Sequence, residues 1–332
     1  GDHRYLHSFP TRRSSDLNET EKGVVRQALT KLVSLIPLTL TEVAGNAGDL
    51  RFNVIPTSGS TTGFAYYPSA SWAIGGDVFL ASSSRSKYTY TPGDHAVLVA
   101  VHEIGHAMGL KHPFETPNVL DTALDDYTHT TMSYTSGRSM LLDFTYSGGR
   151  VHVQGKYTAN PSEYSLLDVA ALQAIYGANT SYRTGTDTYS ISYADRKYLT
   201  IWDAGGVDTL DGAAAIGTCT VDLRGGQFCS IDMRSIAEQQ AETQAYYRSL
   251  GVTWADSWVA EVYADTTYTD NLYTGENNVA IAHGVWLENV TTGSAADTVR
   301  DNGVNNVITT GAGDDVIWLY EGGYDTVDGG SG

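Results

Sequence analysis

The chain has few of the residues that cross-link a protein or anchor it in a membrane. Only two of its 332 residues are cysteine, Cys219 and Cys229, which is too few for a disulfide scaffold. They flank a turn predicted at 224–227, so a cross-strand disulfide and two buried thiols both remain open. No apolar run reaches the length of a membrane span, and the first residues lack the apolar segment of a secretory signal peptide.

Basic side chains are also scarce. The chain has 20 Lys and Arg against 38 Asp and Glu, which gives a formal charge of −18. This excess of acid argues against nucleic acid and against anionic membranes as partners. Together with 35 glycines it suits a secreted protein that carries calcium, although a solvated acidic surface alone would give the same count. The length predicts two domains rather than one.

One segment, VHEIGHAMGLKHP, concentrates residues that bind metals. His102 and His106 are four residues apart, so on a helix both imidazoles leave from one face, with Glu103 beside them. Gly109 permits a positive φ that turns the chain and lets His112 return as a third nitrogen donor. Three neutral imidazoles leave one position of a tetrahedral zinc ion open for water, as in a catalytic site. The alternative is a core helix that happens to carry histidines.

This motif and the later segment TTMSYTSG resemble those of the metzincin peptidases. Met132 and Tyr134 look like the Met-turn of that clan, and the pair His112-Pro113 is similar to the serralysins in particular. The likeness continues through YGAN, WDAGGVDT, RGGQF and IAHGVWLEN, at 176–179, 202–209, 224–228 and 281–289. It implies an α+β metzincin domain, with a twisted mixed sheet and long helices, followed by an all-β parallel β-roll.

The resemblance also implies a role for each residue of the motif. Glu103 would be the general base, and Tyr134 would be an extra zinc ligand that leaves the metal when substrate arrives and donates a hydrogen bond to the oxyanion. Met132 would support the zinc site from beneath without binding the ion. The zinc ligands would be His102, His106, His112 and Tyr134.

Periodicity predicts the elements of the peptidase domain, 18–180. Apolar residues at helical spacing predict a helix from Asn18, capped with Glu21, to Pro37. Further helices are expected after Thr91-Pro92 and at 165–177, and strands at 38–43, 50–55, 63–68 and 76–81. The last of these strands resembles the metzincin edge strand, to which an extended substrate would pair through Gly76, Asp77, Val78, Phe79, Leu80 and Ala81.

The first 17 residues do not resemble the start of such a domain. Their codons match a common sequencing-library adapter from Ser8 to Leu17, which predicts a segment foreign to the fold. A basic targeting tail is the alternative. We therefore expect residues 1–17 to be disordered or to fill the place of a missing first strand.

The C-terminal part, 181–332, carries a repeat of nine or ten residues. Aligned on the calcium-binding pattern G-G-x-G-x-D-x-U-x, the carboxylate positions are Asp297, Asn306, Asp315 and Asp325. The inward apolar positions are Val299, Ile308, Ile317 and Val327. In this motif glycines permit the turn and oxygen atoms bind Ca²⁺, so Gly311 and Gly313 join the candidates, and the pattern predicts a parallel β-roll that stops inside a repeat.

An earlier calcium site is implied by resemblance alone. The segments RTGTDTY and WDAGGVDT are similar to a pair that serralysins wrap around calcium, which carries the role over to Arg183, Gly185, Asp203, Gly205 and Asp208. Residues 233–280 look like an insertion, in which AEQQAETQAYYRSL could be a helix. The acidic group Asp121, Asp125, Asp126 and His129 is either a solvated loop or a second metal site.

Taken together, the residues and the resemblance predict a secreted, calcium-stabilised zinc endopeptidase that hydrolyses proteins or peptides. It is expected to be a monomer with one catalytic Zn²⁺ and several structural Ca²⁺ ions, to avoid membrane insertion, and to be exported by a type I route whose C-terminal signal lies beyond this sequence. A calcium-dependent adhesion module with a vestigial peptidase site is the alternative. A matrixin is disfavoured by Tyr134 and by the repeats.

Overall fold

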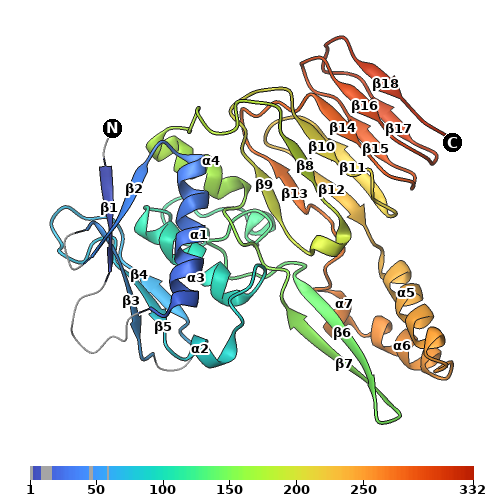
Figure 1. The fold of residues 1–332 in the computed structure, drawn as a ribbon, viewed down its shortest axis with the longest axis horizontal. Coiled ribbons are helices and arrows are strands. Elements are labelled where there is room, and N and C mark those ends of the chain that lie inside the picture. Colours follow the sequence, from blue (N-terminus) through green and yellow to red (C-terminus); the bar gives the residue numbers. More distant parts are fainter. Residues whose placement is uncertain (1–2, 9–16, 45–47, 58–59) are drawn as a thin grey trace. The chain divides into compact units, whose positions relative to one another are not determined.

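A computed structural model describes residues 3–8, 17–44, 48–57 and 60–332 (Figure 1). The chain forms two compact units. The first comprises residues 1–135, 160–184 and 197–205, and the second comprises 136–159, 185–196 and 206–332. One crossing between the units, at 184–185, lies close to the expected boundary near residue 180, whereas residues 136–159 belong to the second unit.

The first unit contains a five-stranded mixed sheet (Figure 1). The strands lie in the order β2-β1-β3-β5-β4, and all neighbours are parallel except β4 and β5. Their bounds are β1 His3–Ser8, β2 Thr39–Ala44, β3 Leu50–Ile55, β4 Gly63–Ala65 and β5 Val78–Ala81. The short strand β9, Leu199–Ile201, also belongs to this unit by its residues.

Of the two expectations for the start of the chain, disorder or occupation of the place of a missing strand, the structure has the second for residues 3–8. They form β1, which pairs in parallel with β2 on one side and with β3 on the other. The physical reason is that β2 and β3 each present an open row of backbone donors and acceptors, and a strand between them satisfies both rows. Residues 9–16 of the adapter-like segment lie outside the described residues.

The prediction of the edge strand was wrong. Residues 78–81 form β5, which is hydrogen-bonded to β3 and to β4 and therefore has no open edge. The outermost strand on this side is β4, formed by only three of the residues predicted as a strand at 63–68. Alternation of side chains marks a strand but carries no information about its neighbours. The sequence therefore could not tell which of the two strands, β4 or β5, lies at the edge of the sheet.

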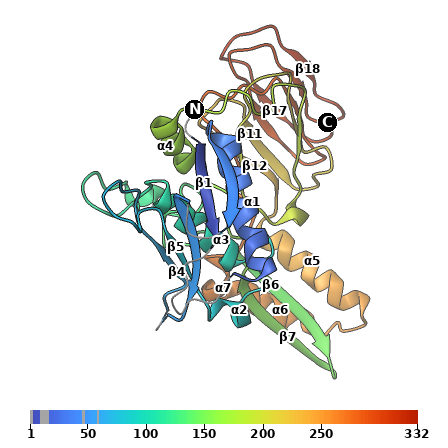
Figure 2. The same ribbon diagram turned by 60° about the vertical axis from the view of Figure 1, so that its left-hand side comes forward.

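Helices α1, Glu19–Leu35, and α3, His95–Ala107, lie side by side against the sheet (Figures 1 and 2). The predicted cap of α1 is confirmed, because Asn18 and Glu21 exchange side-chain-to-backbone hydrogen bonds at 2.9 and 2.7 Å. Val24 of α1 packs against Val97 and Ala100 of α3. The shorter helices of this unit are α2, Ser84–Lys87, η1, Thr122–Leu124, and α4, Leu166–Tyr176.

The second unit contains a hairpin and a helical group. The hairpin is formed by β6, Met140–Ser147, and β7, Arg150–Tyr157, and the helices are α5, Ile236–Ser249, α6, Ala255–Ala264, and α7, Thr266–Thr269 (Figure 2). Phe144 and Val151 of the hairpin pack on a cluster that includes Tyr247 of α5 and Val259 of α6. This shared core explains why the hairpin groups with the residues predicted as an insertion.

The rest of the second unit is the predicted β-roll (Figure 1). One sheet has the order β18-β16-β14-β10-β8, and the other contains β17, β15, β11, β12 and β13 in that order. From β14 to β18 successive strands alternate between the two sheets and pair in parallel, whereas β11, β12 and β13 are antiparallel neighbours in one sheet. Inward positions stack in register, with Val299 opposite Ile317 and Ile308 opposite Val327. Val299 and Ile308 are fully buried, whereas Val327 is 42% exposed. The strand bounds are β8 Thr188–Ser190, β10 Thr209–Asp211, β11 Thr218–Asp222, β12 Phe228–Met233, β13 Val279–Ile281, β14 Asn289–Thr291, β15 Thr298–Arg300, β16 Val307–Thr309, β17 Val316–Trp318 and β18 Thr326–Asp328, with the helical turn η2 at Tyr193–Asp195.

Cys219 and Cys229 lie on β11 and β12, which pair as the predicted hairpin. Both are buried free thiols, so of the two possibilities left open the structure has no disulfide between them. None of the helices in the described part of the chain is both long and apolar enough to cross a membrane.

Candidate metal centre

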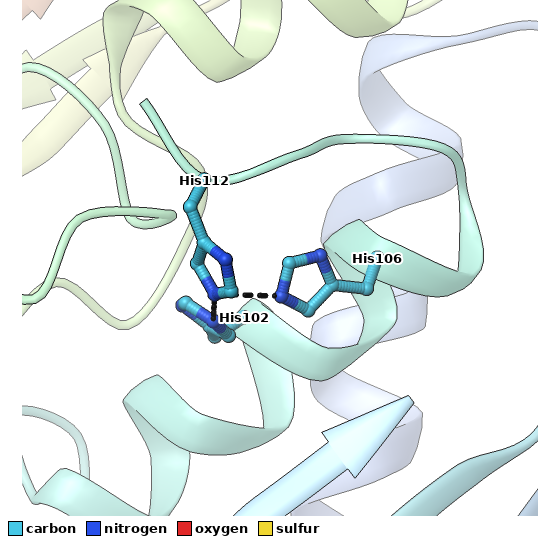
Figure 3. Close-up of side chains that lie close together, drawn as sticks. All are labelled: His102, His106 and His112. Carbon is cyan, nitrogen blue, oxygen red and sulfur yellow. Dashed lines mark hydrogen bonds between the residues drawn. The ribbon is translucent and has the colours of Figure 1, made fainter. Parts of the chain in front are cut away.

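Helix α3 places two histidines and a glutamate of the motif. Its N-terminus is capped by Asp94, whose carboxylate accepts the Ala96 N–H at 2.9 Å. The helix therefore begins a few residues after Thr91-Pro92, where it was predicted to begin. His102 and His106 project from the same face, one turn apart (Figure 3). Gly109 follows with φ +96, a conformation that favours glycine, and turns the chain back towards the helix.

This turn brings the third predicted ligand to the other two. His112 Nε2 lies 3.2 Å from His102 Nε2 and 3.0 Å from His106 Nε2 (Figure 3). Among the described residues these three side chains form a group whose donor atoms are all within 4.8 Å of one another. The sequence prediction of the triad's convergence therefore agrees with the geometry.

The outer nitrogen of each ring is occupied. Nδ1 of each lies 2.8 Å from an oxygen acceptor: His102 from the Thr131 carbonyl, His106 from the Leu110 carbonyl, and His112 from the Glu115 carboxylate. With the proton on each Nδ1, the three Nε2 lone pairs face one another. Such lone pairs repel unless a cation lies between them, and the donor set fits zinc, which takes nitrogen ligands at tetrahedral positions.

Burial favours the neutral form of the His102 and His106 rings. Desolvation lowers the pKa of His102 to about 3, and it also lowers the pKa of His106. Neutral imidazoles are the form that binds a metal ion.

Glu103 follows His102 on α3 and is buried, with 6% of its surface exposed. Burial raises the pKa of its carboxyl to about 8, and Oε2 is buried with no hydrogen-bond partner among the described residues. Its other oxygen faces strand β4, since a Cβ added at Gly63 would lie 3.0 Å from Glu103 Oε1. A buried polar atom without a partner is unusual, and it leaves this carboxylate available to a ligand.

Met132 lies directly beneath the helix. It is 1% exposed, and its sulfur would be only 2.6 Å from a Cβ added at Gly105, between the two helical histidines. Gly105 is thus the residue that allows the methionine to approach. The neighbouring Thr131 is held by Asp168 of α4, whose carboxylate accepts both the N–H (2.7 Å) and the hydroxyl (2.8 Å) of Thr131.

Asp168 was not predicted to have a role. Through Thr131 it supports the carbonyl that accepts from His102, although the two segments are distant in sequence. Its only signal in the sequence is its place three residues after Ser165, where it completes the cap of α4.

Tyr134 lies beside two rings of the triad. Its ring centroid is 4.7 Å from that of His112 and 5.8 Å from that of His102, and the side chain is 67% exposed. Partial burial raises the pKa of its hydroxyl, and the Glu103 carboxylate adds to the effect. The side chain is thus close to the site and accessible to a ligand.

The acidic loop behaves as local structure. Asp126 accepts from His129 Nδ1 at 2.8 Å, Asp125 accepts from the Ser133 hydroxyl at 2.6 Å, and Asp121 caps the short helix η1. Each of these carboxylates stabilises a nearby turn, which favours the loop interpretation over a second metal site.

In the β-roll, one turn fits a hard cation. A Cβ at Gly311 would lie 2.1 Å from the Gly293 carbonyl oxygen, and one at Gly313 would lie 2.3 Å from the Ala295 oxygen, so backbone oxygens of successive turns approach closely here. Asp315 accepts the Asp297 N–H through Oδ1 at 2.9 Å. Asp315 Oδ2 is buried and has no hydrogen-bond partner among the described residues. Oxygen atoms of this kind are the ligands that Ca²⁺ prefers.

The turn at Asn306 is closed by hydrogen bonds of the side-chain amide. Its side-chain Nδ2 donates to the carbonyls of Leu287 (3.1 Å) and Glu288 (3.2 Å), and to Oδ1 of Asn302 at 3.2 Å. N–H donors therefore meet the oxygens that a cation would need. The role of Asn306 as a calcium ligand stays a prediction, which this bonding disfavours. Asp325, by contrast, accepts the Asn306 N–H at 2.9 Å and keeps its carboxylate at the predicted position.

The residues of the earlier calcium segment are divided between the two units. Arg183, Asp203 and Gly205 belong to the first, and Gly185 and Asp208 to the second. Asp208 is buried and accepts the Asp187 N–H at 2.8 Å. The role of this segment stays a prediction.

Comparison with known proteins gives a consistent pattern. The family profile described as matrixin, a peptidase family, matches residues 7–135. The chain is 31% identical to serralysin of Proteus mirabilis over 263 residues, covering 68% of this chain and 51% of the relative. It is 27% identical to the metalloprotease AprA of Pseudomonas entomophila over 323 residues, covering 89% of this chain and 56% of the relative. The chain thus spans about half the length of these curated relatives.

Proposed function

Since the chain is a serralysin-like metzincin, we propose that it is a zinc-dependent endopeptidase that hydrolyses peptide bonds in extracellular proteins. The observation that carries this proposal is the convergence of three Nε2 atoms beside Glu103, whose buried Oε2 has no partner in the described part of the chain. The acidic composition supports a secreted protein. Its substrates are proteins or peptides, and one copy of the chain suffices for the site.

Zinc held by His102, His106 and His112 would supply a Lewis acid that polarises a peptide carbonyl and acidifies a water molecule. Glu103 takes a proton from the attacking water at Oε2. It then returns that proton to the leaving amine, so that one carboxyl group serves first as base and then as acid.

Tyr134 serves the developing oxyanion. The exposure of its side chain and its place beside His102 and His112 support a donor role. A preorganised donor of this type typically stabilises the transition state by about 3 kcal/mol. Met132 acts from beneath, where it fixes the helix that carries the other groups.

Strand β4 replaces the predicted edge strand as the binding surface for substrate. It is antiparallel to β5 and outermost in the sheet, and its Gly63 lies against Glu103. An extended peptide that pairs with β4 through main-chain hydrogen bonds would be held next to the general base without any reading of its side chains.

Calcium is proposed to stabilise the β-roll. The supporting observation is the buried Asp315 Oδ2 without a partner among the described residues, in a turn where carbonyl oxygens approach closely. Asp297 and Asp325 occupy equivalent positions in neighbouring turns. The proposed ligand set is Asp297, Gly311, Gly313, Asp315 and Asp325, without Asn306.

The test is to incubate the purified chain with an unfolded protein, with and without a zinc chelator, and to sequence the ends of the products. Internal cleavage that stops with the chelator and returns with added zinc is expected. A chain that binds zinc and calcium but leaves the protein intact would instead support the adhesion module with a vestigial site.

A further inference from the structure

The third histidine of the triad is held differently from the other two. His102 and His106 are fixed by the backbone of α3, whereas His112 lies beyond Gly109 in a segment without regular structure. Its ring is positioned by side chains. Phe114 stacks on it with ring centroids 5.0 Å apart and planes 7° apart, and Glu115 Oε1 accepts from its Nδ1 at 2.8 Å.

Glu115 makes a second contact on the other side of the site. Its Oε2 accepts from the Tyr67 hydroxyl at 3.2 Å. Tyr67 lies between β4 and β5, and its ring meets the ring of His106 edge-on, with centroids 5.5 Å apart. One carboxylate therefore links the segment that carries His112 to a tyrosine that packs on His106.

The backbone around Glu115 is also restrained. Lys111 Nζ donates to the carbonyls of Glu115 and Pro117, and to that of Asn118 at 3.1 Å. The Glu115 N–H donates to the His112 carbonyl at 3.2 Å. The carboxylate is consequently fixed at its base even though its side chain is 41% exposed.

We propose that Glu115 is a positioning residue for the metal centre and that, with Tyr67, it forms a brace between His112 and His106. The brace keeps the His112 proton on Nδ1 and directs its Nε2 lone pair towards the other two. Partners of this kind orient ligating histidines, and their loss typically weakens metal binding about 10-fold to 100-fold. The inference rests on the proposed zinc function.

The experiment measures zinc affinity of the full chain by competition with a chromophoric chelator. Glu115→Ala is expected to weaken zinc binding about 10-fold to 100-fold, and Glu115→Gln, which keeps an acceptor oxygen, by less. Tyr67→Phe removes only one hydroxyl and should weaken binding by about threefold at most. In a chain that already carries Glu115→Ala, Tyr67→Phe should not weaken zinc binding further, because the carboxylate that accepts from the Tyr67 hydroxyl is already absent.

A matched control is Asp126→Ala. This carboxylate also accepts from a histidine three residues away at 2.8 Å, but that histidine, His129, is outside the triad. Zinc affinity should be unchanged. Excess zinc should restore the kcat of Glu115→Gln without a change in KM, which a general loss of structure would not allow.

The outcomes separate the two proposals. If the parent chain and His112→Ala bind zinc equally, the proposed function fails and the brace fails with it. If His112→Ala loses zinc while Glu115→Ala and Glu115→Gln both keep the affinity of the parent within about twofold, only the brace is refuted. Should Glu115→Ala fail to fold, as circular dichroism would reveal, Glu115→Gln decides alone.

Discussion

The metal centre on α3 and the turns of the β-roll hold their donor atoms by different means. Nδ1 of each of the three imidazoles is hydrogen-bonded to a separate oxygen acceptor, the carbonyls of Thr131 and Leu110 and the carboxylate of Glu115. In the roll the donors are carbonyls and carboxylates of successive turns. Carboxylates gathered in this way repel one another until a cation neutralises them.

From this difference we expect the zinc ion to govern the chemistry of the metal centre and the calcium ions to govern the stability of the β-roll. Removing zinc should leave α3, which carries His102 and His106, packed in the core of the first unit. Removing calcium leaves buried charge on the turns that join the strands. The predictions below compare the two regions, beginning with the largest expected effect.

Calcium removal should loosen the roll far more than the first unit. If calcium at about one hundred times its dissociation constant contributes about 2.7 kcal/mol, chelation should raise amide exchange of residues 290–328 on the order of 100-fold. Hydrogen exchange with mass spectrometry measures this directly. If the amides of residues 290–328 exchanged at the same rate with and without calcium, the β-roll would not depend on its ion for stability, and the proposed difference between the two regions would be wrong.

Tyr134→Phe should lower kcat on the order of 100-fold with little change in KM. The hydroxyl is assigned to the transition state, and a donor of this type is usually lost at that cost. Steady-state kinetics on a single peptide would show it. A rise in KM at constant kcat would mean that the tyrosine binds substrate instead.

Gly105→Ala should strain the metal centre and leave the roll intact. The new methyl would press on the Met132 sulfur, which is 2.6 Å from its position, and overpacking of this kind costs about 1 to 3 kcal/mol. Thermal unfolding of the first unit should occur at lower temperature. Gly23→Ala, on α1 with open space around the added carbon, is the matched control and should not destabilise the protein.

Asn306→Asp should have the smallest effect on the stability of the β-roll. It should destabilise the roll without calcium and stabilise it with calcium. Without calcium it replaces amide donors by a carboxylate facing the Leu287 and Glu288 carbonyls, at a cost of about 1 kcal/mol. With calcium it should create a ligand and increase the bound calcium by one ion, measured by metal analysis. Unchanged calcium content would show that more than the amide excludes the ion.

Local spacing allowed much of this arrangement to be predicted. His102, Glu103, His106 and His112 follow from the helical period and one glycine turn, and the inward residues of the roll follow from the repeat. Both are short-range patterns that the backbone translates directly into geometry.

Contacts between distant segments could not be predicted. Asp168 reaches Thr131 across 37 residues, and Tyr67 reaches Glu115 across 48. The hairpin β6–β7 joins α5 and α6 through a core that no periodicity reveals. The exchange of β4 and β5 at the sheet edge has the same origin, because strand order is decided by pairing and not by the alternation of side chains.

The most direct test of the account is Glu103→Gln, examined for bound zinc and for cleavage of an unfolded protein in the same preparation. The three histidines are untouched, so the account predicts one zinc per chain as in the parent. Turnover should fall by a factor on the order of 100 to 10,000, because the general base is lost. A variant that retains zinc and cleaves as fast as the parent would contradict the proposed mechanism.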